Sequence, residues 1–163
     1  MQQEETNQWM ILFHIHVQNA HLTHMKRNNP TQEDKELLTK DLCARIPYGV
    51  MCCVFEHTNP VKLLSVKRLH KGTWSWRKGT FVCLFWNDTK PVDYVKPYLR
   101  PMSSMTEEEW TEYKSTWKLV EHDLEDTYEP STESYDWLNA HNFDYRGLIE
   151  KGLALEAPEN MYE

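Results

Sequence analysis

"GVMCCVFEHTNPVKLLSVKRLHKGTWSWRKGTFVCLFW", residues 49–86, is the stretch from which the fold of this 163-residue chain is predicted. It contains three apolar runs, 49–56, 61–70 and 79–86, which are rich in β-branched and aromatic residues and are bounded by turn residues. The short "HTNP" break suits a hairpin connection, whereas the second break is longer and contains glycines. The stretch therefore predicts an antiparallel meander.

Proline limits the strand that follows this meander. Pro91, Pro97 and Pro101 fall within "TKPVDYVKPYLRPM", residues 89–102. Because proline cannot donate a hydrogen bond to a strand ladder, these residues exclude a central strand but allow an edge strand or an extended wrap. The segment from about residue 47 to residue 100 thus predicts a small antiparallel sheet, either curled or closed as an SH3-like barrel.

Helices are predicted on both sides of this sheet. Residues 31–46 form the first, since Thr31 is a suitable N-cap and leucines recur near helical spacing. Residues 103–125 form the clearest one, because Thr106 and Glu109 make a capping box. An apolar, mainly aromatic stripe runs along this helix and is expected to face a partner surface. Its members are Trp110, Tyr113, Trp117, Val120 and Leu124.

The rest of the chain predicts less regular structure. Residues 123–134 are expected to form an acidic loop, and residues 132–141 a short helix. One more short helix is predicted to stop near Gly152, and the last five residues to form a frayed tail.

The predicted elements together indicate an α+β protein with a helix before the sheet and helices after it. Residues 25–163 are expected to form a single α+β domain, whose helical acidic region spans about residues 103–155. Residues 1–24 are interpreted as an extension outside the core, because Met25 opens a natural start and nothing before it supplies a helix cap or a hairpin partner.

The net charge of −7 conceals two regions of opposite sign. Residues 1–100 contain 14 Lys/Arg and 9 Asp/Glu, a balance of +5, whereas residues 101–163 contain 4 and 16, a balance of −12. Such asymmetry is typical of a basic binding face with an acidic appendage, or of two solvated surfaces that attract each other.

No segment suits a membrane or export. The longest apolar run, residues 9–13, falls far short of the roughly 20 residues that a spanning helix needs. Glu4 and Glu5 stand where a secretory signal has basic residues. We therefore expect a cytoplasmic protein. The four cysteines form no C-x-x-C motif, in agreement with buried reduced thiols.

Half of the eight histidines lie within eleven positions: His14, His16, His21 and His24. Strand and helix spacing would pair them on common faces, so that a turn could bring four imidazoles around a zinc ion. However, the stretch contains no carboxylate or thiol to orient them, and structural zinc sites usually include cysteine. We interpret the cluster as a chance feature of the extension, and expect no metal and no other cofactor.

Basic and aromatic residues gather after the second predicted strand. Residues 62–100 contain nine Lys/Arg and only two Asp/Glu. Cations hold phosphates and aromatic rings stack on unpaired bases, so this mixture predicts a surface for RNA or single-stranded nucleic acid. In the alternative interpretation the tryptophans cover one end of the barrel and the lysines keep an edge soluble. The candidate contacts are Lys71, Trp74, Trp76, Arg77 and Lys78.

No catalytic motif stands out in the sequence. It lacks G-x-S-x-G, a glycine-rich phosphate loop and H-E-x-x-H, and its five glycines leave little capacity for tight backbone cradles. An enzyme with an unrecognised site is therefore the least favoured hypothesis. The favoured one is a non-catalytic binding or adaptor protein. The acidic helical region is interpreted as a solvated helix face packed by its Trp stripe onto the sheet; docking of this region on a basic protein surface, or imitation of nucleic-acid charge, is the alternative.

Four phrases resemble a known family: "LTKDLCARIPYGVMC", "PVKLLSVKR", "VDYVKPYLRPMSSMTEEE" and "WLNAHNFDYRGLIEKGLALEAPENMY". They are similar to recurring blocks of uncharacterised small proteins from gut Bacteroidales bacteria and their phages or prophages, and the resemblance covers about residues 31–162. Members of that family begin just ahead of the first helix, in agreement with an extension over residues 1–24. The resemblance implies a mobile-element context and supplies no catalytic residues. The expected partner is a macromolecule, with a host or phage protein favoured and nucleic acid as the alternative.

Overall fold

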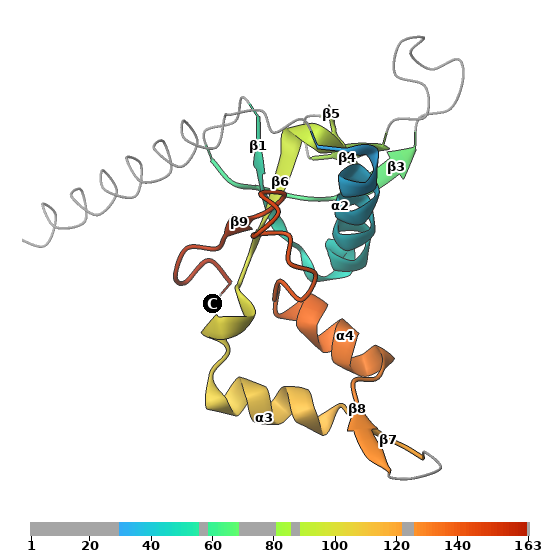
Figure 1. Cartoon of the computed structure of the whole chain (residues 1–163). Coiled ribbons are helices and arrows are strands. Elements are labelled where there is room, and N and C mark those ends of the chain that lie inside the picture. Colours follow the sequence, from blue (N-terminus) through green and yellow to red (C-terminus); the bar gives the residue numbers. More distant parts are fainter. Residues whose placement is uncertain (1–29, 56–58, 69–80, 86–88, 122–125, 163) are drawn as a thin grey trace, which may run out of the picture.

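The computed structural model describes residues 30–55, 59–68, 81–85, 89–121 and 126–162. The chain is α+β, as the sequence predicts. Two sheets and α2 lie in the upper part of Figure 1, and α3, α4 and a hairpin lie below them. The helices are α2 (Gln32–Arg45), α3 (Glu107–Ser115) and α4 (Thr132–Ala140), with short 3₁₀ helices η1 (Ile46–Tyr48), η2 (Val92–Tyr94) and η3 (Met102–Ser104). The strands are β1 (Met51–Val54), β2 (Val61–Lys62), β3 (Ser65–Arg68), β4 (Phe81–Leu84), β5 (Thr89–Pro91), β6 (Val95–Leu99), β7 (Lys118–Val120), β8 (Thr127–Glu129) and β9 (Leu155–Glu156).

The strands form three sheets rather than one meander. The largest has the order β2-β1-β6-β9, in which only the β6–β9 pair is parallel. A second antiparallel sheet has the order β3-β4-β5, and β7 pairs with β8 alone. The predicted strand at 61–70 divides into β2 and β3, which belong to different sheets. The prediction of one meander is therefore wrong, and an SH3-like arrangement is not confirmed.

Proline does not confine β6 to an edge, so that prediction is also wrong. Pro97 lies in the middle of this strand, which has β1 on one side and β9 on the other. The Phe55 N–H donates to the backbone carbonyl oxygen of Tyr94 at 2.9 Å, which makes these two residues a hydrogen-bonded pair. Hydrogen-bonded and non-hydrogen-bonded pairs alternate along antiparallel strands, so Cys52 and Pro97, three pairs further on, form a non-hydrogen-bonded pair. The missing N–H of Pro97 thus faces away from β1, and β9 pairs with β6 only from the next residue onward. Proline costs the ladder nothing at this position.

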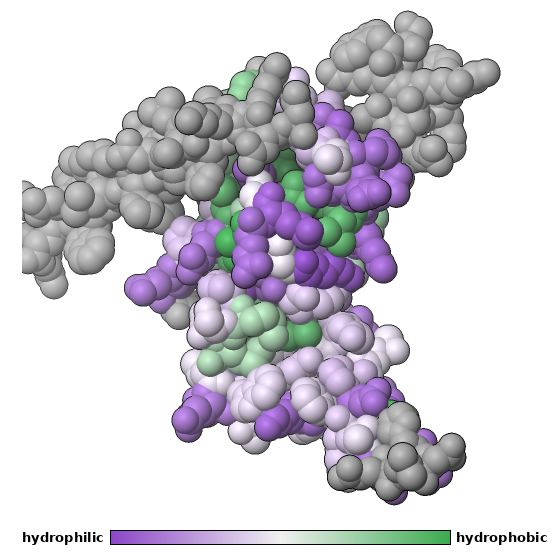
Figure 2. Space-filling view, in the orientation of Figure 1, coloured by the Kyte–Doolittle hydropathy of each residue, from purple (hydrophilic) through white to green (hydrophobic). Residues whose placement is uncertain are grey.

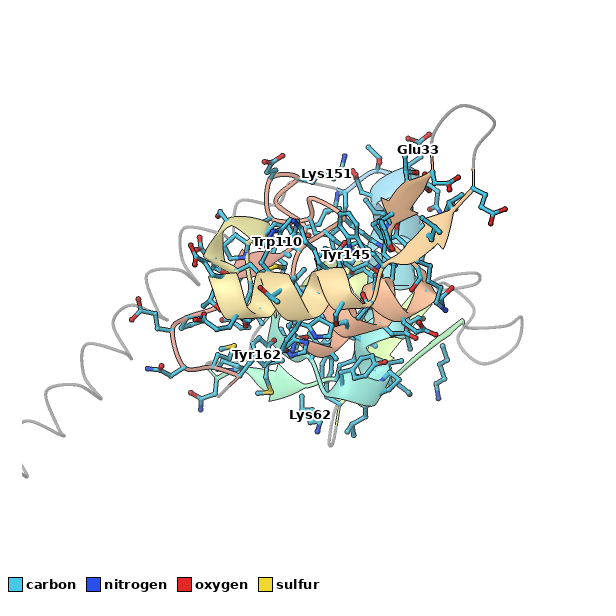
Figure 3. The ribbon with its side chains drawn as sticks, turned by 90° about the horizontal axis from the view of Figure 1, so that it is seen from below. Glu33, Lys62, Trp110, Tyr145, Lys151 and Tyr162 are labelled. Atoms are coloured by element: carbon cyan, nitrogen blue, oxygen red, sulfur yellow. The ribbon has the colours of Figure 1, made fainter. Side chains whose placement is uncertain are left out.

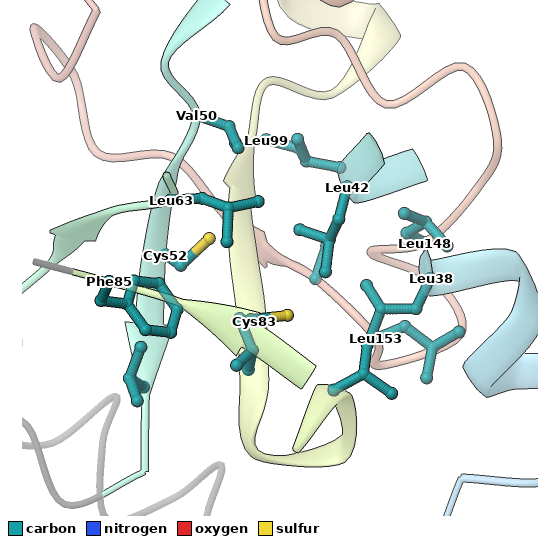
Figure 4. Packing of buried hydrophobic residues seen from close by; sticks show 14 residues of the cluster. Leu38, Leu42, Val50, Cys52, Leu63, Cys83, Phe85, Leu99, Leu148 and Leu153 are labelled. Carbon is teal, nitrogen blue, oxygen red and sulfur yellow. The ribbon is translucent and has the colours of Figure 1, made fainter. Parts of the chain in front are cut away.

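The main core lies between α2 and the two larger sheets. Thr31 is the N-cap of α2, as the sequence predicts, and Asp34 completes a capping box; one face of the helix then buries Leu38 and Leu42. Figure 4 shows these leucines converging with Cys52 and with other apolar side chains from the strands and from the C-terminal segment. Complete burial of one such leucine stabilises the fold by about 1.5–3 kcal/mol. Sheets and helix are therefore held together by one continuous apolar cluster.

The C-terminal segment is attached to the sheet, which the sequence does not predict. No helix follows α4 in the described residues; turns lead instead to β9. The Tyr162 hydroxyl donates to the backbone carbonyl oxygen of Tyr98 at 2.7 Å and accepts from the backbone N–H of Met51 at 3.2 Å. The predicted helix near Gly152 and the predicted frayed tail are both wrong, because pairing with β6 and this hydroxyl fix the segment.

Helix α3 is shorter than predicted. Its N-terminus matches the capping box, but it ends at Ser115 instead of continuing to residue 125. The Ser131 hydroxyl donates to the Thr116 oxygen at 2.8 Å, and this contact from a distant residue holds the chain in a turn. Residues 118–120 then form β7, and part of the expected acidic loop forms β8. Helix α4 agrees with its prediction. None of the described helices is long and apolar enough to cross a bilayer.

Candidate binding surface

The site residues predicted from the sequence lie outside the described residues. His14, His16, His21 and His24 fall in the segment 1–29, together with the proposed extension. Lys71, Trp74, Trp76, Arg77 and Lys78 fall in the segment 69–80. Within the described part of the chain, no three or more His, Cys, Asp or Glu side chains are grouped as a metal ion requires. The candidate surface is therefore built from the lower part of the molecule, which comprises α3, the β7–β8 hairpin and α4 (Figure 1).

Arg100 fixes the start of this lower part. Its guanidinium binds the Glu109 carboxylate through two hydrogen bonds of 2.6 and 2.9 Å, and it lies over the Phe143 ring at 4.3 Å. Glu109 also accepts from the Thr106 N–H at 2.9 Å, which closes the capping box of α3. The hydrogen bond with Arg100, and to a smaller extent that with Thr106, lowers the pKa of Glu109. One carboxylate thus caps α3 and ties it to the end of β6.

The predicted aromatic stripe becomes an aromatic cluster between α3 and α4. Tyr113 is buried, and its ring lies 5.7 Å from the Trp117 and Trp137 rings. Trp137 in turn stacks on Phe143 at 5.8 Å. Trp110 lies 5.6 Å from Tyr113 but remains 41% exposed. The interior of the cluster packs this part of the protein, whereas Trp110 on α3 remains available for contact with a partner.

The β7–β8 hairpin projects from this cluster. Leu119 and Tyr128 stand directly opposite each other in its register. They are the most exposed large apolar residues among those described, at 50% and 67%. Lys118, on the opposite face of the hairpin, forms a 2.9 Å ion pair with Glu133 of α4. The hairpin is thus anchored through one face and presents an apolar pair on the other.

Negative charge surrounds these exposed apolar residues. The sequence from 107 to 136 contains 11 Asp/Glu and 2 Lys/Arg, a net charge of −9. Figure 2 shows the lower end of the molecule covered largely by hydrophilic residues and by residues of intermediate hydropathy. Figure 3 views this end from below, with α3 in front, Trp110 labelled and carboxylate oxygens at the rim. The surface combines acidic and aromatic groups, as the docking interpretation of this region expects.

A buried ionic network connects the upper and lower parts, and the sequence analysis missed it. Asp41 and Arg45 are both fully buried on the inner face of α2 and are joined at 2.8 Å. Arg45 also donates to the Phe143 oxygen at 2.8 Å, and Arg146 donates to Asp41 at 2.6 Å. The sequence contains one sign of this network: Asp41 and Arg45 are four residues apart in a predicted helix, next to the apolar Leu42. Exposed ion pairs on helices have the same spacing, so the spacing does not show that the pair is buried.

Three of the four cysteines are partly or fully buried, whereas Cys43 is exposed, so the expectation of buried thiols is wrong for Cys43. Cys52 and Cys83 are buried, and Cys53 is partly buried. Burial raises the pKa of the Cys52 and Cys53 thiols and raises that of Cys83 to about 12. These three thiols are therefore protonated at neutral pH, as the expected buried reduced state requires.

Comparison with known proteins adds no relative to this description. No protein-family model, no curated protein and no solved structure matches the chain.

Proposed function

We propose that this protein is a non-catalytic binding or adaptor protein that engages another macromolecule through the acidic and aromatic surface of α3, β7–β8 and α4. One observation carries the proposal. Of the seven exposed large apolar residues in the described part of the chain, four lie in a segment with a net charge of −9: Trp110, Leu119, Tyr128 and Tyr135. Exposed apolar groups bordered by charge are typical of protein interaction sites.

The partner is a protein rather than a nucleic acid. Phosphate groups would be repelled by this surface, whereas a basic protein surface would be attracted to it. The resemblance to proteins of gut Bacteroidales bacteria and their phages supports a mobile-element origin, with a host or phage protein as the partner. The working compartment in this proposal is the cytoplasm, where the buried thiols stay reduced.

The second candidate function is binding of RNA or single-stranded DNA. It is favoured by the basic and tryptophan-rich sequence at Lys71, Trp74, Trp76, Arg77 and Lys78. Such binding would weaken as salt concentration rises and would be lost in Trp74→Ala/Trp76→Ala, because stacking on bases supplies part of the affinity.

The test is affinity purification of the tagged full chain from host lysate, with and without nuclease. Bound proteins are identified by mass spectrometry, and bound nucleic acids by sequencing. Recovery of a protein partner that resists nuclease is the expected result. Recovery that depends on nucleic acid would contradict the adaptor function and support the second candidate.

A further inference from the structure

We propose that the outer face of the β7–β8 hairpin docks an extended cationic segment of a partner protein, in which a lysine or arginine and an apolar residue stand two positions apart. The inference rests on the proposed function and specifies the chemistry of the partner. It is built on the apolar pair Leu119 and Tyr128, on the carboxylates next to that pair, and on the open edge of β7.

The apolar pair supplies an anchor for the partner. Leu119 and Tyr128 are cross-strand neighbours, so their side chains stand on the same face of the hairpin. Half of Leu119 and two thirds of Tyr128 remain exposed, at 50% and 67%. The opposite face carries the exposed ion pair between Lys118 and Glu133, so the apolar anchor is found on the outer face. A leucine or valine laid across the pair would remove apolar surface of both residues from water.

The neighbouring carboxylates select cationic residues. Glu121 follows Leu119 by two positions and Asp126 precedes Tyr128 by two, and both are exposed. Strand alternation places these carboxylates on the same face as the apolar pair. Like charges opposite each other across a hairpin destabilise it. A lysine or arginine between Glu121 and Asp126 would remove that repulsion and gain two attractive contacts.

The backbone of β7 suits an extended partner. β8 is its only strand partner among the described strands, and no other backbone hydrogen bond of the described residues involves Lys118–Val120. An added strand along this edge would satisfy its outward N–H and C=O groups. In an extended segment side chains two positions apart share one face, so an apolar residue and a lysine two positions from it would both face the outer side of the hairpin.

The observations favour such a segment over other occupants. A nucleic acid or an anionic membrane would bring negative charge to a surface that is already acidic. A second copy of the chain also has a net charge of −7, so close approach of two copies is opposed at low salt. A cationic polypeptide complements both the charge and the apolar pair.

The test uses the full chain and a defined probe, a short fluorescent peptide in which leucine and lysine stand two positions apart, separated by threonine. A peptide with glutamate in place of each lysine is the reference. Affinity is measured by anisotropy at low and high salt for the parent and four variants. Leu119→Ser/Tyr128→Ser removes the anchor, and Glu121→Gln/Asp126→Asn removes the carboxylates. Their matched controls are Leu64→Ser, which changes a 44% exposed leucine elsewhere, and Glu150→Gln.

The parent and both controls should bind the lysine peptide equally and the glutamate peptide not at all. Leu119→Ser/Tyr128→Ser should weaken binding of the lysine peptide by about tenfold. Glu121→Gln/Asp126→Asn should weaken binding too, and should remove most of the salt dependence of the affinity. No binding of the lysine peptide by the parent, or equal affinities for the anchor variant and Leu64→Ser, would overturn the docking proposal. Either result would leave a nuclease-resistant partner from lysate intact as support for the adaptor function, so the two proposals fail separately.

Discussion

The Arg146 guanidinium donates to the Asp41 carboxylate across 2.6 Å, although the two residues are 105 positions apart in the chain. Asp41 is fully buried and also pairs with Arg45 on the same helix. Through Arg45 the network reaches the Phe143 oxygen, in the segment that follows α4. This carboxylate therefore connects α2, in the upper part, to the chain that supports the aromatic cluster.

Substitution of Asp41 should strongly destabilise the fold. Asp41→Asn leaves the buried charge of Arg45 without its carboxylate, and breaking a buried pair in this way costs about 3–5 kcal/mol. The melting temperature should then fall by roughly 10 °C or more. Asp93→Asn is the control, because the Lys35–Asp93 pair is partly exposed and such pairs contribute about 0–1 kcal/mol. Equal melting temperatures for the two variants would contradict the structural role of Asp41.

Stability should depend on pH through Glu109. Its folded-state pKa is lowered, chiefly by Arg100. The ionised carboxylate therefore stabilises the fold fully above the ordinary glutamate pKa, and this contribution is lost as pH falls through the lowered value. Glu109→Gln should cost about 1–2 kcal/mol at pH 7 and progressively less in acid, as thermal melts across pH would show. Glu108→Gln changes an exposed neighbour and should not show this pH dependence. A loss of stability in Glu109→Gln that grows as the pH falls would contradict a lowered pKa for Glu109.

Thiol labelling should separate the cysteines by burial. Cys43 is exposed, whereas Cys52 and Cys83 are buried with raised pKa values. Maleimide at neutral pH should modify Cys43 in the native protein and should modify the two buried thiols only after unfolding. Peptide mass spectrometry gives the order of modification. Native-state labelling of Cys52 at the rate of Cys43 would show that the core is open at β1.

The Tyr162 hydroxyl should contribute measurably to stability. Tyr162→Phe keeps the ring but removes the bonds to Met51 and to the Tyr98 oxygen, at a cost of about 1–2 kcal/mol. The same change at Tyr128, which is 67% exposed, should stay within about 0.5 kcal/mol. Chemical denaturation of both variants compares the two costs. Indistinguishable stabilities would mean that the C-terminal residues do not hold β1 and β6 together.

Local signals in the sequence predicted the helix starts, whereas contacts between distant residues determined much of the rest. Thr31 with Asp34, and Thr106 with Glu109, act within one turn, so their caps are readable from spacing. The end of α3 depends on Ser131, which is fifteen residues from its acceptor Thr116. No local pattern carries that information.

The same distinction applies to the sheet and to the candidate surface. A rule about proline predicted an edge for β6, but the effect of Pro97 depends on which side its nitrogen faces, and that is a matter of register. The aromatic stripe was predicted through Trp110 and Tyr113, which lie in α3. Leu119 and Tyr128 were not recognised as a pair, because that pairing requires the hairpin that replaces the predicted helix and loop.

Quantitative affinity purification with variants tests the binding function most directly. The parent, Leu119→Ser/Tyr128→Ser and Trp74→Ala/Trp76→Ala are compared in nuclease-treated lysate at equal protein loading. We expect a protein partner that is retained by the parent and by the tryptophan variant and is depleted with the hairpin variant. Recovery that disappears with nuclease, or with the tryptophan variant alone, would contradict the proposed binding function.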